Sequence, residues 1–153
     1  MNEKMKNKER ILIVDDSEMN RMILADMLED QYEILEAADG ARGIAIMQQM
    51  GSQISLVLLD IVMPEMDGFE VLAVMNQKKW IEDVPVIMIS AESTPSYVQR
   101  AYELGVTDYI SRPFDSLVVQ RRVINTIMLY AKQRKLIQMV TKQMYERRTP
   151  ASW

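Results

Sequence analysis

The sequence predicts an α/β domain in which a doubly wound, five-stranded parallel sheet is sandwiched by helices. Of the 153 residues, 48% are apolar and 26% are charged, which is the composition of one globular domain. Short apolar runs alternate with segments of helical periodicity along the chain, and this alternation is typical of parallel sheets covered on both faces. Polar side chains follow several of the apolar runs, where ligands bind in such sheets.

Each element follows from a local pattern. The run 11–14 is wholly apolar and bounded by charge, so it is predicted to be a buried strand. A helix should begin after it, with Asp16 or Ser17 as the N-cap. Glycines end two later helices, at Gly51 and Gly105. The predicted strands are 11–14, 33–37, 56–59, 84–89 and 108–110, and the later helices are 40–50, 67–76, 95–104 and 116–147.

The fourteen methionines are interpreted as core residues rather than as an adaptable binding surface. Met22 and Met27 recur at helical spacing in the first helix, and Met47 does so in the second. Methionine fills irregular core gaps well. All three are therefore expected to be buried.

Composition excludes several functional classes. The chain has no cysteine and no histidine, which rules out thiol catalysis, Cys/His zinc sites, haem ligation and Ser-His-Asp mechanisms. No Gly-rich loop carries the Gly-Lys-Ser/Thr signature of a P-loop. No apolar run approaches the ~18 residues of a membrane span, and the polar segment 1–8 is expected to be flexible. We expect a cytoplasmic protein without a membrane contact.

Charge is unevenly distributed. Residues 1–115 hold 21 acids and 10 bases, a net charge of −11, whereas residues 116–153 hold one acid and eight bases, a net charge of +7. A basic tail can indicate nucleic-acid binding. Because these bases are spaced rather than massed, a solvated helix face is the favoured interpretation.

Carboxylates follow the first and third predicted strands. Asp15 and Asp16 come after the run 11–14, and Asp60 comes after the run 56–59. An adjacent pair of aspartates is often only a helix cap. Three carboxylates meeting at one sheet edge, however, repel one another unless a cation neutralises them, and hard oxygen ligands suit Mg²⁺. The coincidence of the pair with Asp60 predicts a magnesium site.

Four ordered segments resemble the receiver domain of two-component response regulators. They are 11–16 (ILIVDD), 58–68 (LLDIVMPEMDG), 89–91 (ISA) and 108–114 (DYISRPF). The resemblance covers roughly residues 9–130 and implies a flavodoxin-like receiver fold. It also implies that the chain is a phosphoacceptor signalling domain rather than an enzyme, with a sensor histidine kinase or a phosphotransfer protein as its partner.

The resemblance assigns roles to individual residues. Asp60 would accept the phosphoryl group. Mg²⁺ would be held by Asp16 and Asp60 directly, by Asp15 largely through water, and by the backbone carbonyl of Val62. The hydroxyl of Ser90 and the backbone amide of Ala91 would contact the phosphoryl oxygens.

The fifth-strand motif assigns a switch and contains one departure from the family pattern. Ser90 and Tyr109 match the switch residues of the family, although Tyr109 alone would be interpreted as an ordinary strand aromatic. The family has lysine where this chain has Arg112, whose planar fork places its charge differently on a phosphate. Pro113 is expected to follow a cis peptide bond, as in the family.

The loop after Asp60 has a structural interpretation. Pro64 and Gly68 are expected to shape this loop and start the next helix, without taking part in chemistry.

Residues 116–147 contain neither proline nor glycine and are predicted to form one helix of about 50 Å, longer than the sheet needs. An imperfect heptad seam suggests a two-stranded coiled coil. Its members are Ile127, Tyr130, Arg134, Ile137, Thr141 and Met144. We expect a receiver domain over 9–130, a helical extension over 131–148, a flexible end over 149–153 and a homodimer formed through the last helices. We also expect the chain to be a fragment of a longer regulator, whose output domain is missing from it.

Two functions remain open at this level. The chain is either a phosphoacceptor that signals through the helices 95–104 and 116–147, or a receiver-like scaffold that dimerises without phosphate, which Arg112 and the long helix would suit. A magnesium-dependent phosphatase of the haloacid dehalogenase type is disfavoured. That family needs a second acid two residues after its nucleophile, and here Val62 occupies this position.

Overall fold

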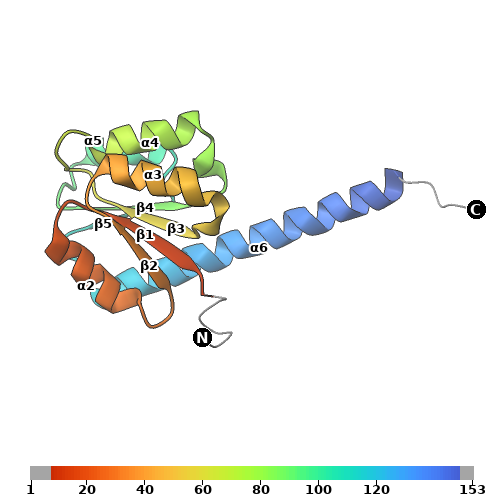
Figure 1. The fold of residues 1–153 in the computed structure, drawn as a ribbon, viewed down its shortest axis with the longest axis horizontal. Helices are drawn as coiled ribbons and strands as arrows, with labels where there is room; N and C mark the ends of the chain where they lie inside the picture. Colours follow the sequence, from red (N-terminus) through yellow and green to blue (C-terminus); the bar gives the residue numbers. More distant parts are fainter. Residues whose placement is uncertain (1–7, 149–153) are drawn as a thin grey trace, which may run out of the picture.

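A computed structural model describes residues 8–148 and contains a five-stranded sheet between two helical layers (Figure 1). The strands are β1 (Arg10–Val14), β2 (Glu33–Ala37), β3 (Leu56–Leu59), β4 (Val86–Ser90) and β5 (Asp108–Ser111). The helices are α2 (Glu18–Leu28), α3 (Gly40–Met50), α4 (Gly68–Gln77), α5 (Pro95–Glu103) and α6 (Ser116–Arg148), with short 3-10 turns η1 (Gly51–Gln53) and η2 (Trp80–Glu82).

All strands of the sheet run parallel in the order β2-β1-β3-β4-β5, which confirms the predicted fold class. The order changes direction at β1, because β2 lies on one side of it and β3 on the other. The loops that leave β1 and β3 therefore diverge at a topological switch point, where α/β sheets bind their ligands.

Each face of the sheet has its own apolar core. On one face, α3, α4 and α5 cover a cluster that includes Met47, Leu72 and Ala101 (Figure 1). On the other face, α2 and α6 cover a second cluster that includes Leu28 and Val123. The central strands β1, β3 and β4 are buried almost completely, which explains their apolar runs, whereas the edge strand β2 is partly exposed.

The outer face of α2 differs from the prediction. Met47 is buried and Met27 is partly buried, as expected, but Met22 is 56% exposed and was wrongly predicted as a core residue. The helix turns Leu24 and Leu28 inward instead. Met22 lies two residues, or about 200°, from Leu24 on the helix, so both cannot face the sheet.

The fourth strand begins two residues later than predicted. Pro85 has no backbone N–H to donate to the sheet, although its carbonyl accepts from Val57 N at 3.0 Å. Val84 N donates to Trp80 O at 2.9 Å and thus closes the preceding turn. The regular ladder therefore starts at Val86.

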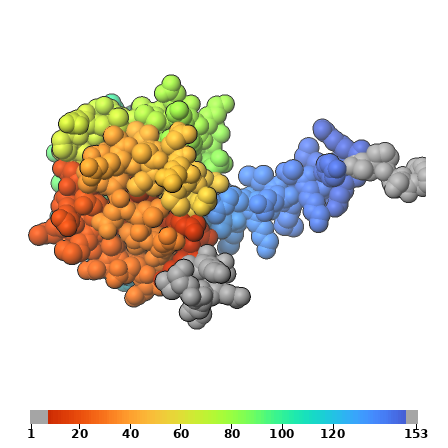
Figure 2. Space-filling model, in the orientation of Figure 1, coloured from red at the N-terminus to blue at the C-terminus, as the bar shows by residue number. Residues whose placement is uncertain are grey.

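The last helix extends well beyond the sheet. At 33 residues, α6 is about 50 Å long, and its C-terminal half projects from the rounded body of the molecule (Figures 1 and 2). Its contacts with the body include a hydrogen bond of 3.3 Å between the hydroxyls of Tyr130 and Thr107. All residues from 135 to 148 are exposed. Within residues 8–148, no helix has the length and apolarity needed to cross a bilayer.

Candidate functional site

Three carboxylates meet at the sheet edge formed by the ends of β1 and β3. Asp15, Asp16 and Asp60 can each present a carboxylate oxygen such that all these atoms lie within 4.8 Å of one another. Asp15 and Asp60 are 2% and 6% exposed, respectively, whereas Asp16 is exposed to solvent. The structure therefore brings together the three side chains that the sequence analysis singled out as metal ligands.

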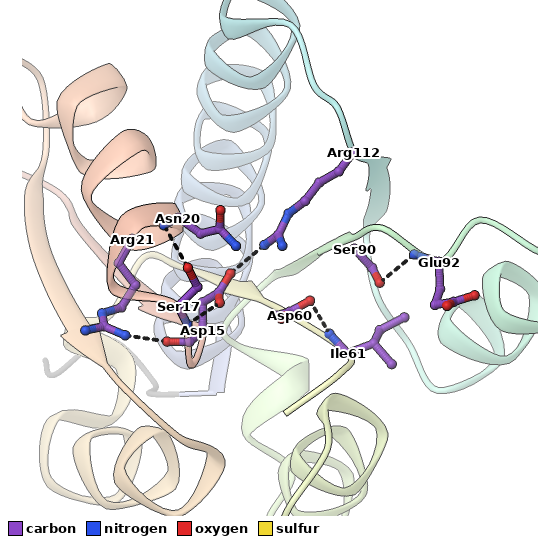
Figure 3. Close-up of polar contacts among 9 residues, drawn as sticks. All are labelled: Asp15, Ser17, Asn20, Arg21, Asp60, Ile61, Ser90, Glu92 and Arg112. Carbon is purple, nitrogen blue, oxygen red and sulfur yellow. Dashed lines mark hydrogen bonds and ion pairs between the residues drawn. The ribbon is translucent and has the colours of Figure 1, made fainter. Parts of the chain in front are cut away.

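Local backbone contacts hold Asp15 in place. Its Oδ1 accepts from the backbone N–H of Ser17 at 2.9 Å (Figure 3). Ser17 is the N-cap of α2, so this contact ties the carboxylate to the start of a helix. Arg21 donates to the backbone carbonyl of Asp15 at 2.6 Å and also pairs with Glu36 at 3.0 Å.

The surroundings of Asp60 disfavour the ionised form of its carboxyl group. Burial, followed by the negative charge of Asp15, raises the pKa of Asp60 from 3.8 to about 6. The positive charge of Arg112 and the Ile61 N–H, which donates to Asp60 Oδ1 at 2.9 Å, act in the opposite direction. The carboxylate is thus placed where a further cation would strongly favour its ionised form.

The donor set suits a divalent cation. Two buried carboxylates and one exposed carboxylate provide hard oxygen ligands on one side, and the exposed position of Asp16 leaves the cluster open to water. Val62 lies two residues after Asp60 in the loop that leaves β3, with its side chain 62% exposed. These features fit Mg²⁺, which retains several waters when bound by proteins.

Arg112 reaches across the site from the end of β5 (Figure 3). Its Nη2 donates to Asp15 Oδ2 at 2.5 Å, and its side chain is only 18% exposed. The peptide bond between Arg112 and Pro113 is cis, as expected. The guanidinium therefore contacts the acidic cluster itself.

Ser90 ends β4 and is fully buried beside the cluster. Its Oγ accepts from the backbone N–H of Glu92 at 3.1 Å (Figure 3), and the exposed Ala91 lies between them. The hydroxyl of Tyr109 donates to the backbone carbonyl of Glu92. The Glu92 backbone thus links the two side chains that resemble the switch pair of the family.

Tyr109 is turned inward and buried, at 7% exposure, and this burial raises the pKa of its phenol. Its own backbone carbonyl accepts from Arg122 of α6 at 3.1 Å. Arg122 also pairs with Asp108 at 3.3 Å. The first turns of α6 are therefore tied to the strand that carries Tyr109.

Close backbone packing shapes the loop after Asp60. The N–H of Gly68 donates to Ile61 O at 2.8 Å. A Cβ at Gly68 would lie 2.3 Å from the carbonyl oxygen of Asp60, so only glycine allows this approach. Asp67 caps α4 by accepting from Glu70 N at 2.8 Å. This packing fixes the backbone that carries Asp60.

Two contacts at the site were not found by sequence reasoning. The pairing of Arg112 with Asp15 spans 97 residues, and no local pattern indicates it. The hydrogen bond from the Tyr109 hydroxyl ends on the backbone carbonyl of Glu92, a group that every residue has, so no residue type in the sequence indicates it. A third contact, from Arg21 to the backbone carbonyl of Asp15, carried a weak signal in the sequence, because Arg21 lies one turn after the predicted N-cap Ser17.

Comparison with known proteins identifies the family. The sequence profile described as "Response regulator receiver domain" matches residues 11–124. The chain belongs to the response regulator receiver domain family. This receiver domain is 40% identical over 113 residues to a probable cyclic di-GMP phosphodiesterase of Vibrio cholerae, covering 74% of this chain and 25% of that protein. It is 35% identical over 121 residues to response regulator RR06 of Streptococcus pneumoniae, covering 78% of this chain and 54% of that protein. The chain thus spans only a quarter to about half of these relatives.

Solved receiver structures have the same fold. The chemotaxis protein CheY4 of Vibrio cholerae superposes with a TM-score of 0.71 at 27% identity, covering 78% of this receiver domain and 98% of that chain. The CheX–CheY–BeF3–Mg²⁺ complex of Borrelia burgdorferi gives a TM-score of 0.72 at 31% identity, covering 82% of this chain and 93% of that one. These similarities confirm the flavodoxin-like receiver fold.

Proposed function

We propose that the chain receives a phosphoryl group on Asp60 from a phosphohistidine of a sensor histidine kinase or phosphotransfer protein. The observation that carries this proposal is the position of Asp60: a buried carboxylate at the end of β3, surrounded by two further carboxylates and one guanidinium. Membership of the receiver family supports the same function. A buried acid without a reaction to perform would be an unusual cost to the fold.

The proposed reaction transfers the phosphoryl group between two residues. A carboxylate oxygen of Asp60 attacks phosphorus, a P–O bond forms, and the P–N bond to the imidazole breaks. The nitrogen keeps the electron pair of that bond, and the product is an acyl phosphate. Such transfers depend on positioning and on neutralisation of the charge that spreads over the phosphoryl oxygens.

We propose Mg²⁺ as the cofactor, with Asp15, Asp16, Asp60 and the carbonyl of Val62 as the groups that hold it. When bound, the ion supplies the positive charge that phosphoryl transfer requires. The raised pKa of Asp60 and its two carboxylate neighbours support this assignment. A relative of this chain has been solved in a complex with BeF3 and Mg²⁺.

Three groups of this chain are proposed to bind the phosphoryl oxygens. Ser90 donates its hydroxyl, Ala91 its backbone amide, and Arg112 its guanidinium. Support comes from their places at the same sheet edge as Asp60: Ser90 ends β4, the strand next to β3, Ala91 follows it, and Arg112 follows β5, the strand beyond β4. Because Ser90 Oγ accepts from Glu92 N, its movement toward a phosphoryl group would release the Glu92 backbone.

We propose that this release is the switch. Glu92 also accepts from the hydroxyl of Tyr109, so a shift of Ser90 changes the support of that ring. The backbone of Tyr109 is in turn bonded to Arg122 of α6. The signal would thus pass from Asp60 through the region of α5 and α6.

The projecting part of α6 is proposed to mediate homodimerisation. Five exposed apolar residues of α6 recur at steps that keep them on one side of the helix, while the exposed Met139 and Tyr145 lie outside this stripe. The five are Leu129, Leu136, Ile137, Val140 and Met144, each between 47% and 64% exposed. Ile127 of the expected heptad seam lies in the core of its own domain, at 5% exposure, and so cannot belong to such an interface. We place the receiver domain at 9–130 and the dimerising extension at 131–148.

A phosphorylation-independent scaffold is the second candidate. One observation favours it: Arg112 pairs with Asp15, so one of the three carboxylates has a counter-ion from the chain itself. In that case dimerisation through α6 would proceed regardless of phosphate.

Intact-mass analysis after incubation with acetyl phosphate tests the proposal. We expect one phosphate adduct that requires Mg²⁺ and is absent from Asp60→Asn. Light scattering on the same samples should show an increase in the dimer fraction on phosphorylation. A dimer fraction that does not change, in a protein without any adduct, would favour the scaffold.

A further inference from the structure

The helix α5 covers the same face of the sheet as α4, but it contributes little to the core (Figure 1). Of its nine residues, only Ala101 is fully buried and Val98 is partly buried. The loop before the helix, 91–94, is exposed throughout. A helix that buries so little apolar surface is held weakly by the hydrophobic effect, so other contacts must keep it in place.

Hydrogen bonds tie the C-terminal end of α5 to its neighbours. Asn76 of α4 donates from Nδ2 to the carbonyl of Leu104 at 2.7 Å, and the hydroxyl of Tyr102 donates to Asp108 Oδ1 at 3.4 Å. Within the part of the chain that the structure describes, residues 95–100 have no such tie, because their hydrogen bonds stay inside the helix and its cap. The N-terminal half of α5 therefore depends on packing.

Phe69, in the first turn of α4, provides this packing. It is 3% exposed, and the ring of Tyr97 stacks on it with centroids 5.6 Å apart and planes inclined by 11°. The guanidinium carbon of Arg100 lies 4.2 Å from the centre of the same ring. Stacked, offset rings and a cation over a ring face both attract. Tyr97 and Arg100 are one turn apart on α5, so one face of that helix makes both contacts.

Phe69 is also joined closely to the loop that carries Asp60. It follows Gly68, whose N–H donates to Ile61 O at 2.8 Å. A Cβ at Gly68 would lie 2.3 Å from the carbonyl oxygen of Asp60, so the start of α4 packs directly on this loop. The Ile61 N–H in turn donates to the carboxylate of Asp60 at 2.9 Å. A displacement of the backbone after Asp60 therefore moves Phe69 as well.

We propose that Phe69, Tyr97 and Arg100 form an aromatic clamp that holds the N-terminal half of α5 to the loop after Asp60. Phe69 is then a positioning residue, because it acts on α5 and does not touch the reacting atoms. The inference deepens the proposed function and rests on it for the signal that the clamp carries. It adds a route from Asp60 to α5 that runs through α4 and is separate from the route through Tyr109.

Hydrogen–deuterium exchange in chelator tests the clamp itself. In Tyr97→Leu, the backbone amides of 98–104 should exchange at least about fivefold faster than in the wild type, while those of β1 and β3 stay unchanged. Arg100→Gln should act in the same direction. Combining Tyr97→Leu with Phe69→Leu should give exchange within about twofold of Phe69→Leu alone, because that variant already lacks both ring contacts.

Tyr102→Leu is the matched control, because it removes another exposed tyrosine of the same helix that does not stack on Phe69. It should change the exchange of 98–101 less than about twofold. Should Phe69→Leu weaken the whole domain, seen as faster exchange in β1, the comparison of Tyr97→Leu and Arg100→Gln with the control still decides the result.

Mg²⁺ with beryllofluoride, which stands in for a phosphoryl group, tests the signal. In the wild type we expect exchange at both 60–68 and 95–104 to change by at least about twofold. In Tyr97→Leu the response at 60–68 should persist, whereas the response at 95–104 should fall to less than half. Tyr109→Phe leaves the clamp intact, so both responses should persist in it.

Unchanged exchange of 98–104 in Tyr97→Leu would overturn the clamp, as would an equally large change in Tyr102→Leu. A response of α5 to beryllofluoride that is the same in Tyr97→Leu and in the wild type would overturn its part in signalling. Failure of the proposed function looks different: Mg²⁺ and beryllofluoride then change no exchange at 60–68 even in the wild type, while the result in chelator still decides the clamp.

Discussion

Replacement of Asp60 by asparagine is expected to stabilise the metal-free protein at neutral pH. Asp60 is 6% exposed, and burial together with the charge of Asp15 raises its pKa from 3.8 to about 6. The folded protein therefore prefers the protonated acid, whereas the unfolded chain releases the proton near pH 4. The contribution of Asp60 to the stability of the wild type therefore falls as pH rises from about 4 to about 6 and stays at the lower level above this window.

The magnitude follows from the shift. A difference of about two pKa units corresponds to about 3 kcal/mol at 1.36 kcal/mol per unit. Asparagine carries no charge, and its amide oxygen can still accept from the Ile61 N–H. We expect Asp60→Asn to be more stable than the wild type by on the order of 2–3 kcal/mol at pH 8, and by almost nothing at pH 4.

Urea unfolding in chelator at pH 4, 5, 6 and 8 measures this difference. Asp16→Asn is the matched control, because it removes the same charge from the same cluster at an exposed position. We expect less than about 1 kcal/mol from the control. The reasoning is refuted if Asp60→Asn unfolds at the same or a lower urea concentration than the wild type at pH 8, or if its advantage does not grow between pH 4 and 6.

Three further results are expected. Gly68→Ala should lower the free energy of unfolding by about 2–3 kcal/mol in urea titrations, since its Cβ would lie 2.3 Å from the Asp60 carbonyl oxygen, and a loss below about 1 kcal/mol would argue against this packing. Tyr109→Phe should cost about 1 kcal/mol by the same measurement, because it removes the buried hydroxyl that donates to the backbone carbonyl of Glu92, and an unchanged midpoint would show that the hydrogen bond contributes nothing. Val140→Glu should reduce dimer formation in sedimentation without changing the unfolding of the body. Residues 131–148 carry six bases and one acid, so salt should strengthen the wild-type dimer, and a dimer weakened by salt would contradict pairing through α6.

The fold was predictable because the central strands β1, β3 and β4 are buried on both faces. The segments 33–37 and 56–59 match β2 and β3 residue for residue. Of the two, 56–59 is the unbroken apolar run expected of a strand covered on both faces, whereas β2 at the sheet edge carries Glu33 and Glu36. The errors arose where periodicity alone left the inward direction undetermined. Met22 matched the helical spacing, yet the face centred on Leu24 turns toward the sheet.

The site was partly predictable for a related reason. Asp15, Asp16 and Asp60 follow strands directly, so parallel topology alone brings them to one edge. The partner of a long side chain is not determined this way. Arg112 follows β5 at the same edge, and its pairing with Asp15 follows only from the three-dimensional arrangement.

Chemical mapping of the phosphorylated residue tests the central claim most directly. The protein is incubated with acetyl phosphate and Mg²⁺, reduced with borohydride, which converts an acyl phosphate to an alcohol, and analysed as peptides by mass spectrometry. We predict homoserine at position 60 in the Mg²⁺ sample and unmodified aspartate there in the chelator sample. Reduction at another acid, or at none while the protein demonstrably binds the metal, would contradict Asp60 as the acceptor.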